Sequence, residues 1–127
     1  MPNPQNAPPP DHRVALGAYG ERVAVRALTE AGLQVLDRNW RCREGELDVV
    51  AREGDALVFC EVKTRSGTGY GPPAEAVTHA KRRRLRVLAS AWLAAHDHHA
   101  PDLRFDVVGV HVPPTGPVRV THLRNAF

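Results

Sequence analysis

Residues 46–65 read ELDVVAREGDALVFCEVKTR, and their pattern is the strongest indication of the fold. Its two halves, 46–52 and 56–65, are rich in valine, leucine and phenylalanine, which predicts two β-strands. The Gly54-Asp55 pair near its middle suits the two centres of a two-residue hairpin turn of the II′ kind. Counting outward from that turn places Asp48 directly opposite Glu61.

This register brings charged side chains together on one face of the hairpin. Side chains of a strand alternate between faces, so Leu57, Phe59, Glu61 and Lys63 share a face, and Asp48 faces them from the other strand. Two carboxylates in a cross-strand pair repel each other, and an unpaired charge among apolar residues is costly. A divalent cation between the carboxylates would compensate both effects, and oxygen ligands with free positions for water suit Mg²⁺ or Mn²⁺. The hairpin therefore predicts a metal site at Asp48 and Glu61.

Two further residues fit the same site. Only Lys63 and Lys81 among the 17 basic residues are lysines, so Lys63 stands where arginine, permanently protonated and planar, would be a poor substitute. Glu21 shares a helical stripe with Val25 and Leu28, a face that should pack on the sheet. We therefore expect Glu21, Asp48, Glu61 and Lys63 to form a catalytic set, with Glu21 as a further metal ligand. Glu46 shares a face with Asp48 by alternation and is left outside the set.

Simpler interpretations exist for each residue alone. Asp48 or Glu61 by itself is typical of a salt bridge at a strand edge, and Glu61 with Lys63 is typical of a surface ion pair. The conjunction of paired acids, a rare lysine and a helical glutamate favours the metal site. A turn longer or shorter by one residue would place Asp48 on the wrong face.

The rest of the chain predicts an α/β fold in which helices flank one central mixed β-sheet, in the order α-β-β-β-α-β-β. Residues 1–12 are rich in proline and read as a disordered tail ahead of a single domain, residues 13–127. The expected elements are a helix at 13–32, a strand at 33–36 followed by a turn at 37–39, the hairpin, a glycine-rich loop at 66–73, a helix at 74–96, and strands at 104–112 and 118–123.

Length and composition exclude several classes of protein. A chain of 127 residues with 43% hydrophobic residues suits one globular domain. It has no apolar run long enough to span a membrane and no recognisable signal peptide. Two cysteines are too few for a disulfide scaffold, so we expect a protein of the reducing cytoplasm.

Several sequence motifs of this chain resemble those of a known family. GELDVV followed by FCEVKTR is similar to the PD-(D/E)xK signature of metal-dependent nucleases, although Glu46 or Leu47 stands where some nucleases have proline. With GAYGERVA, RNWRCREGELDVVA, PPAEAV, KRRRLRVLA and RFDVVGV, the chain resembles the YraN family of small bacterial proteins, which are regarded as endonucleases on sequence grounds. The resemblance implies a fold like that of restriction endonucleases and Holliday-junction resolvases. It also implies that Glu21, Asp48 and Glu61 are the acids and Lys63 the catalytic lysine of a Mg²⁺- or Mn²⁺-dependent endonuclease.

The charge pattern agrees with a nucleic-acid substrate without requiring one. The net charge is +3, and a solvated basic helix face would explain the run at residues 81–86 equally well. We expect DNA, branched or otherwise structured, as the substrate, and a homodimer would suit cleavage of two strands. The alternatives are a non-catalytic nucleic-acid-binding module on a nuclease fold and an RNA-processing nuclease. The residues expected to bind nucleic acid are Arg41, Arg43, Arg65, Lys81, Arg82 and Arg83.

Two other polar features have no clear place in this site. His96, His98 and His99 are too close in sequence to share one ion easily, so we expect residues 96–99 to form a surface loop. Asp106 lies in an apolar strand, and the sequence does not indicate its role.

Overall fold

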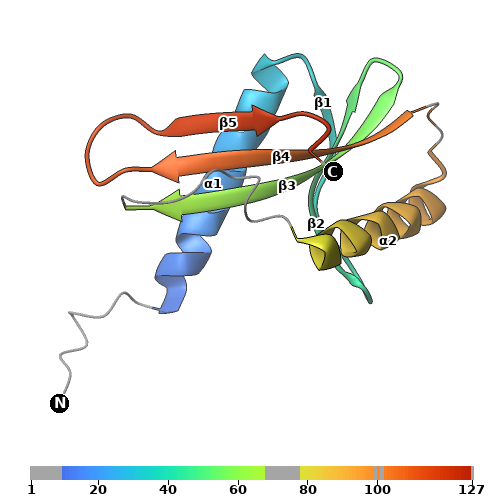
Figure 1. The fold of residues 1–127 in the computed structure, drawn as a ribbon, viewed down its shortest axis with the longest axis horizontal. Coiled ribbons are helices and arrows are strands. Elements are labelled where there is room, and N and C mark those ends of the chain that lie inside the picture. Colours follow the sequence, from blue (N-terminus) through green and yellow to red (C-terminus); the bar gives the residue numbers. More distant parts are fainter. Residues whose placement is uncertain (1–9, 68–77, 99, 101, 127) are drawn as a thin grey trace.

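The computed structural model describes residues 10–67, 78–98, 100 and 102–126. Its elements follow in the order α1 (Pro10–Glu30), β1 (Gln34–Cys42), β2 (Gly45–Glu53), β3 (Ala56–Ser66), α2 (His79–His96), β4 (Asp102–Val112) and β5 (Arg119–Leu123) (Figure 1). The predicted α/β class and element order are confirmed. Helix α1 begins three residues earlier than expected, at Pro10, a residue type favoured in the first turn of a helix. Residues 1–9 of the expected tail, and 68–77 of the expected loop and helix start, lie outside the described residues.

The five strands form one mixed sheet in the order β1-β2-β3-β4-β5. Strands β3 and β4 are parallel, and the other neighbouring pairs are antiparallel. The hairpin of β2 and β3 has the predicted register, because its pairs run from Glu53 with Ala56 to Val49 with Cys60. Gly54 has a φ of 57°, the positive value that the first centre of a II′ turn requires.

The sheet has a hydrophobic core on each face because its strand residues alternate. On one face Val58, Cys60, Val108 and Val110 pack with Ala24 and Leu28 of α1, which runs across the strands in Figure 1. On the other face Leu57 and Phe59 pack with the buried stripe of α2, which consists of Leu85, Leu88, Ala89 and Trp92. Each helix is thus held by an apolar stripe, as helical spacing predicts. No helix in the described part of the chain combines the length and apolar character of a membrane span.

The predicted turn at residues 37–39 is wrong, because these residues lie within β1. The pairing with β2 shifts by one residue between Val35 and Asp37, and Asn39 has a φ of 52°. Strand β1 is an edge strand in which Arg38 and Asn39 are exposed, so polar side chains are tolerated there. Beyond the irregularity, Trp40 pairs with Leu47 and extends the strand.

Candidate active site

A glycine allows the first half of α1 to lie directly on β3. Gly20 is buried, and a Cβ at this position would overlap the Thr64 hydroxyl and lie 2.7 Å from the Thr64 Cβ. Rotation of the threonine side chain would not relieve a contact with its Cβ, so only glycine permits this close approach. Glu21 follows Gly20 in the chain and is therefore held, half-buried, in the wall of a cavity beside the sheet.

Asp48 lies where the hairpin strands stop pairing. The regular pairs end at Val49 and Cys60, and Asp48 would be next in line with Glu61. Instead, Asp48 Oδ2 accepts a hydrogen bond of 2.8 Å from the backbone N–H of Val62. The carboxylate thus occupies a position where a backbone carbonyl would otherwise continue the ladder.

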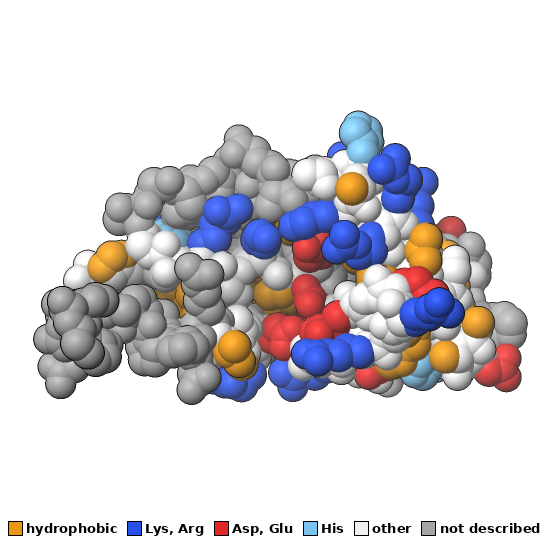
Figure 2. Space-filling model, turned by 90° about the horizontal axis from the view of Figure 1, so that it is seen from below, with side chains coloured by type: hydrophobic (Ala, Val, Ile, Leu, Met, Phe, Trp, Pro, Cys, Tyr) orange, Lys and Arg blue, Asp and Glu red, His pale blue; other side chains and the backbone are white. Residues whose placement is uncertain are grey.

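Three carboxylates meet at this point. Glu21, Glu46 and Asp48 can each offer one oxygen such that all three oxygens lie within 4.8 Å of one another. Arg41 Nε donates to Glu46 Oε2 at 2.7 Å, but the Arg41 side chain is 79% exposed, so solvent screens its charge. Figure 2 shows acidic side chains gathered near the middle of one face of the molecule, bordered by lysine and arginine side chains. We call Glu21, Glu46 and Asp48 the acidic cluster.

The environment of Asp48 disfavours its charged form. Burial is the largest cause and raises the pKa of Asp48 to about 7, although the hydrogen bond from Val62 acts in the opposite direction. Repulsion from the carboxylates of Glu21, Glu61 and Glu46 adds to the rise. A carboxylate that is buried beside other carboxylates without a compensating cation is typical of functional sites.

The acidic cluster opens into a cavity of about 850 Å³. One wall comes from α1, and the others come from β1, β2 and β3. Lys63 lines this cavity together with the acidic cluster, and Arg41 stands at its β1 side. The lining residues are Val14, Leu16, Gly17, Ala18, Glu21, Asn39, Arg41, Glu46, Asp48, Val62, Lys63 and Thr64.

Glu61 and Lys63 both interact with Lys81 of α2. Glu61 Oε1 lies 3.5 Å from the Nζ of Lys81, and its charge contributes to the raised pKa of Asp48. The pKa of Lys63 is lowered, first by burial and then by its contact with the Lys81 ammonium. The structure therefore brings Glu21 and Asp48 together in the acidic cluster and places Lys63 in the wall of the same cavity, whereas Glu61 is near enough to raise the pKa of Asp48 but is not among the lining residues. Within the described residues, however, the cluster of three carboxylate oxygens contains Glu46 in place of Glu61.

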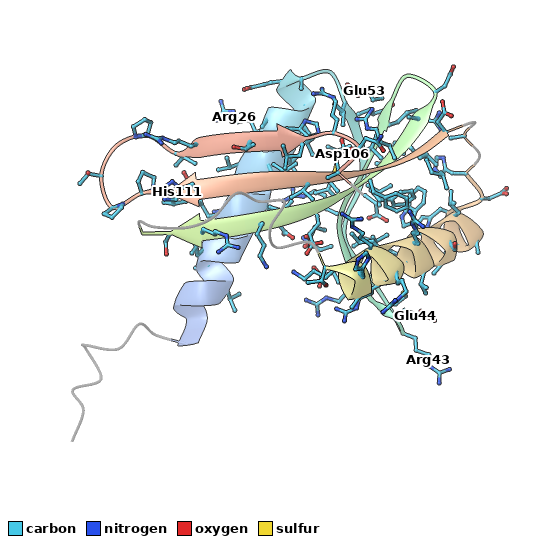
Figure 3. All side chains as sticks on the ribbon, in the orientation of Figure 1. Arg26, Arg43, Glu44, Glu53, Asp106 and His111 are labelled. Atoms are coloured by element: carbon cyan, nitrogen blue, oxygen red, sulfur yellow. The ribbon has the colours of Figure 1, made fainter. Side chains whose placement is uncertain are left out.

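The six residues expected to bind nucleic acid do not form one patch. Arg41 lines the cavity, while Arg43 projects from the outer end of the β1–β2 hairpin (Figure 3). Lys81 contacts Glu61, and the Nε of Arg65 is buried with no hydrogen-bond partner among the described residues. Arg82 is half-buried and Arg83 is exposed. Their roles stay predictions.

Two members of this arrangement were not expected in it, because Glu46 was left outside the catalytic set and Lys81 was expected only to bind nucleic acid. Alternation indicated the position of Glu46, and the rarity of lysine was the signal at Lys81. Neither signal gives a distance, because the contacts depend on how β1 and α2 pack on the hairpin.

Asp106 in β4 is another buried carboxylate, separate from the acidic cluster and in the interior of the sheet (Figure 3). Its side chain is fully buried, and each carboxylate oxygen accepts two hydrogen bonds. Arg104 donates to both oxygens at 2.9 and 3.0 Å, His122 Nε2 lies 2.7 Å from Oδ2, and the Asn125 N–H donates to Oδ1 at 2.9 Å. Burial would raise the pKa of Asp106, but these hydrogen bonds outweigh it and lower the pKa.

The expectation of a surface loop at residues 96–99 is wrong for its first member. His96 is the last residue of α2, and its ring stacks on Trp92 at a centroid distance of 4.3 Å. Trp92 donates its indole N–H to Asp37 Oδ2 at 2.9 Å, and His96 Nε2 lies 3.4 Å from the same oxygen. This cluster fastens the end of α2 to β1. His99 lies outside the described residues.

The comparisons with known proteins agree with the resemblance noted in the sequence. Residues 20–110 match the model of the uncharacterised protein family UPF0102. The chain belongs to this family. A UPF0102 protein of Frankia casuarinae is 61% identical over 113 residues, which cover 89% of this chain and 96% of the relative. A UPF0102 protein of Rhodococcus opacus is 54% identical over 116 residues, which cover 91% and 98%.

Among solved structures, the chain is similar to SfsA of Pyrococcus furiosus in complex with Ca²⁺. The TM-score is 0.35 and the sequence identity 13%, over 88% of this chain and 63% of that one. The UPF0102 description names no activity, so the function has to be inferred from the residues of the site.

Proposed function

We propose that this UPF0102 protein is a Mg²⁺- or Mn²⁺-dependent endonuclease that hydrolyses phosphodiester bonds in DNA, with branched or otherwise structured DNA as its substrate. The observation that carries the proposal is the acidic cluster, in which burial and neighbouring carboxylates raise the pKa of Asp48 to about 7. Oxygen donors on a partly open cavity suit a hard divalent cation that keeps positions for water and phosphate.

The chain supplies two sets of groups for this reaction. Asp48 and Glu61 would bind the cation, with Glu21 as a further or water-mediated ligand, and the geometry adds Glu46 to this set. A bound divalent cation supplies Lewis acidity and lowers the pKa of a coordinated water. The protein's own part is to hold the oxygens of Glu21, Glu46 and Asp48 close together from α1 and β2, with the charge of Glu61 on β3 acting on Asp48.

Lys63 would act on the attacking water or on the phosphate. It lines the cavity, and burial lowers its pKa, which brings proton exchange with a water closer to neutral pH than for a solvated lysine. In its charged form it would neutralise the charge that builds on the phosphate. Arginine could not exchange the proton, which explains a lysine in an arginine-rich chain.

The charges around the cavity support a nucleic-acid substrate. Arg41 lines the cavity and Lys81 pairs with Glu61, so cations are available to phosphates near the carboxylates. Contacts of this kind read the backbone and not the bases, which supports recognition of DNA structure. Both cysteines, Cys42 and Cys60, are free thiols, which is in keeping with a reducing cytoplasm.

The experiment that tests this function is cleavage of a labelled substrate panel: linear duplex, single strand, flap, four-way junction and structured RNA. Wild-type protein is incubated with Mg²⁺, Mn²⁺ or chelator, beside Glu61→Gln and Lys63→Ala. Glu30→Gln is the matched control, because Glu30 lies on α1 with a side chain that is 71% exposed and pairs only with the neighbouring Arg26 at 3.4 Å among the described residues.

We expect metal-dependent cleavage of the junction or flap that falls by at least about 100-fold in both site variants and stays unchanged in Glu30→Gln. Preferential cleavage of the RNA would replace DNA with RNA as the substrate. Salt-sensitive binding without cleavage, unchanged in the site variants, would contradict the enzyme and leave a binding module.

A further inference from the structure

Lys81 occupies a position of α2 that faces the sheet. Counting by helical spacing, it precedes Leu85, Leu88 and Trp92 on the stripe that packs against β2 and β3. Its side chain is only 31% exposed, whereas Arg83 and Arg84 next to it are exposed. Lys81 therefore differs from the solvated basic face that the run at residues 81–86 would otherwise form.

The start of α2 fixes this position relative to β3. The Thr78 side chain caps the helix and accepts a hydrogen bond from the Lys81 N–H at 3.2 Å. The buried stripe behind it holds the helix on the sheet. The facing stripe on β3 runs through Leu57 and Phe59 to Glu61, so the lysine meets the first carboxylate beyond the apolar core.

The contacts of Lys81 join both halves of the proposed site. Its Nζ lies 3.5 Å from Glu61 Oε1, and it also contacts the ammonium of Lys63. The chain's two lysines therefore lie close to each other, and Glu61 acts electrostatically on both. Two neighbouring cations repel each other, so Lys81 can leave Glu61 when another positive charge arrives there.

We infer that Lys81 is a positioning residue that holds the Glu61 carboxylate as its counter-ion and gives it up to a divalent cation, becoming free to contact a phosphate of the substrate. This inference rests on the proposed function. The flexible four-carbon stem of lysine allows the ammonium to move while the helix stays in place. Lys81 thus competes with the cation for Glu61, and its loss should strengthen cation binding.

The test is the affinity for Mn²⁺ alone, measured by isothermal titration calorimetry on the full-length protein. Lys81→Met and Lys81→Gln remove the charge and keep most of the stem, so at least one folded variant should be available. Lys81→Arg keeps the charge, and Arg84→Ala removes an exposed charge from the same helical turn. Circular dichroism and thermal unfolding verify that each variant is folded.

We expect Lys81→Met and Lys81→Gln to bind Mn²⁺ about threefold to tenfold more tightly than the wild type, since a competing charge close to a ligand has been removed. Lys81→Arg should bind Mn²⁺ within about twofold of the wild type, and so should Arg84→Ala, because the charge of Arg84 is solvated. A lysine that served only to fasten α2 would give unchanged or weaker Mn²⁺ binding in the Met and Gln variants.

The result also separates this inference from the proposed function. If Asp48→Asn abolishes Mn²⁺ binding while Lys81→Met leaves it unchanged or weaker, the role of Lys81 is contradicted and the metal site stands. If the wild type binds no Mn²⁺, the metal-dependent function fails, and the inference fails with it.

Discussion

Two aspartates of the same sheet, Asp48 in β2 and Asp106 in β4, have opposite electrostatic environments. Asp106 is fully buried yet has a lowered pKa, because hydrogen bonds from Arg104, Asn125 and His122 outweigh the effect of burial. Asp48 has a pKa raised to about 7, because one backbone hydrogen bond does not offset its burial and the nearby carboxylates.

Burial alone therefore does not mark a functional carboxylate. The Asp106 carboxylate is satisfied by the chain itself, which indicates a structural role in fastening the C-terminal residues to β4. The acidic cluster has three carboxylates and, among the described residues, one ion pair, that of Glu46 with the exposed Arg41. This excess of negative charge favours a role that involves a cation.

The largest expected effect comes from exchanging each aspartate for asparagine. Asp106→Asn should lower the free energy of unfolding by about 2 to 4 kcal/mol, since it leaves buried donors facing an amide. Asp48→Asn should leave it unchanged or raise it by up to about 1 kcal/mol in metal-free buffer at pH 8, because an amide removes the repulsion and still accepts from Val62. Urea unfolding measures both. A larger loss of stability in Asp48→Asn than in Asp106→Asn would reverse the comparison.

A smaller effect on stability should follow from a substitution in the contact between α1 and β3 that leaves both aspartates in place. Gly20→Ala should destabilise the protein by about 2 to 3 kcal/mol, because the new methyl group cannot fit beside Thr64. Gly17→Ala on the same helix is the matched control, since a Cβ there meets nothing within 4 Å and should stabilise the helix by about 0.5 to 1 kcal/mol. Thermal unfolding of both variants checks the pair. If both variants changed the stability equally, the contact between α1 and β3 would have room for a methyl group at position 20.

The two aspartates should also give opposite dependences on pH. Between about pH 4 and 7 unfolded Asp48 has lost its proton while folded Asp48 keeps it, so its contribution to stability becomes less favourable as pH rises. Asp106 contributes stability above the ordinary pKa of 3.8, and this contribution is lost as pH falls through its lowered native pKa.

The effect of Asp48 is measured by urea unfolding of the wild type and of Asp48→Asn, in the presence of chelator, at a series of pH values. The stability of Asp48→Asn relative to wild type should increase from about pH 4 to 7 and then level off. A difference that does not change with pH would mean that the Asp48 carboxylate is better compensated than its surroundings indicate.

The smallest effect should come from Arg41, whose ion pair with Glu46 is mostly solvated. Arg41→Ala should change the free energy of unfolding by no more than about 0.5 kcal/mol, as for other exposed pairs. Arg26→Ala, which breaks the exposed pair with Glu30, provides the reference. A loss well above that of Arg26→Ala would show that the acidic cluster already has an effective counter-ion.

Local sequence signals were sufficient to predict the strands of the central hairpin and their register. The Gly54-Asp55 turn can be recognised from local residues alone, and turn length sets which residues face each other. Helical periodicity likewise placed Glu21 on the packed face of α1, and the element order followed from the alternation of helical and strand patterns. These features depend on interactions between residues close in the chain.

Which carboxylates come together depends on packing between distant parts of the chain. Strict alternation would place Leu47 and Val49 on one face, but they pack in different cores, so the strand is irregular at Asp48. That irregularity, together with the departure of β2 from β3, brings Glu46 and not Glu61 into the acidic cluster. The contact of Lys81 with Glu61 depends on how α2 packs against the sheet. These distances arise from packing between elements that are far apart in sequence, which periodicity within one segment does not encode.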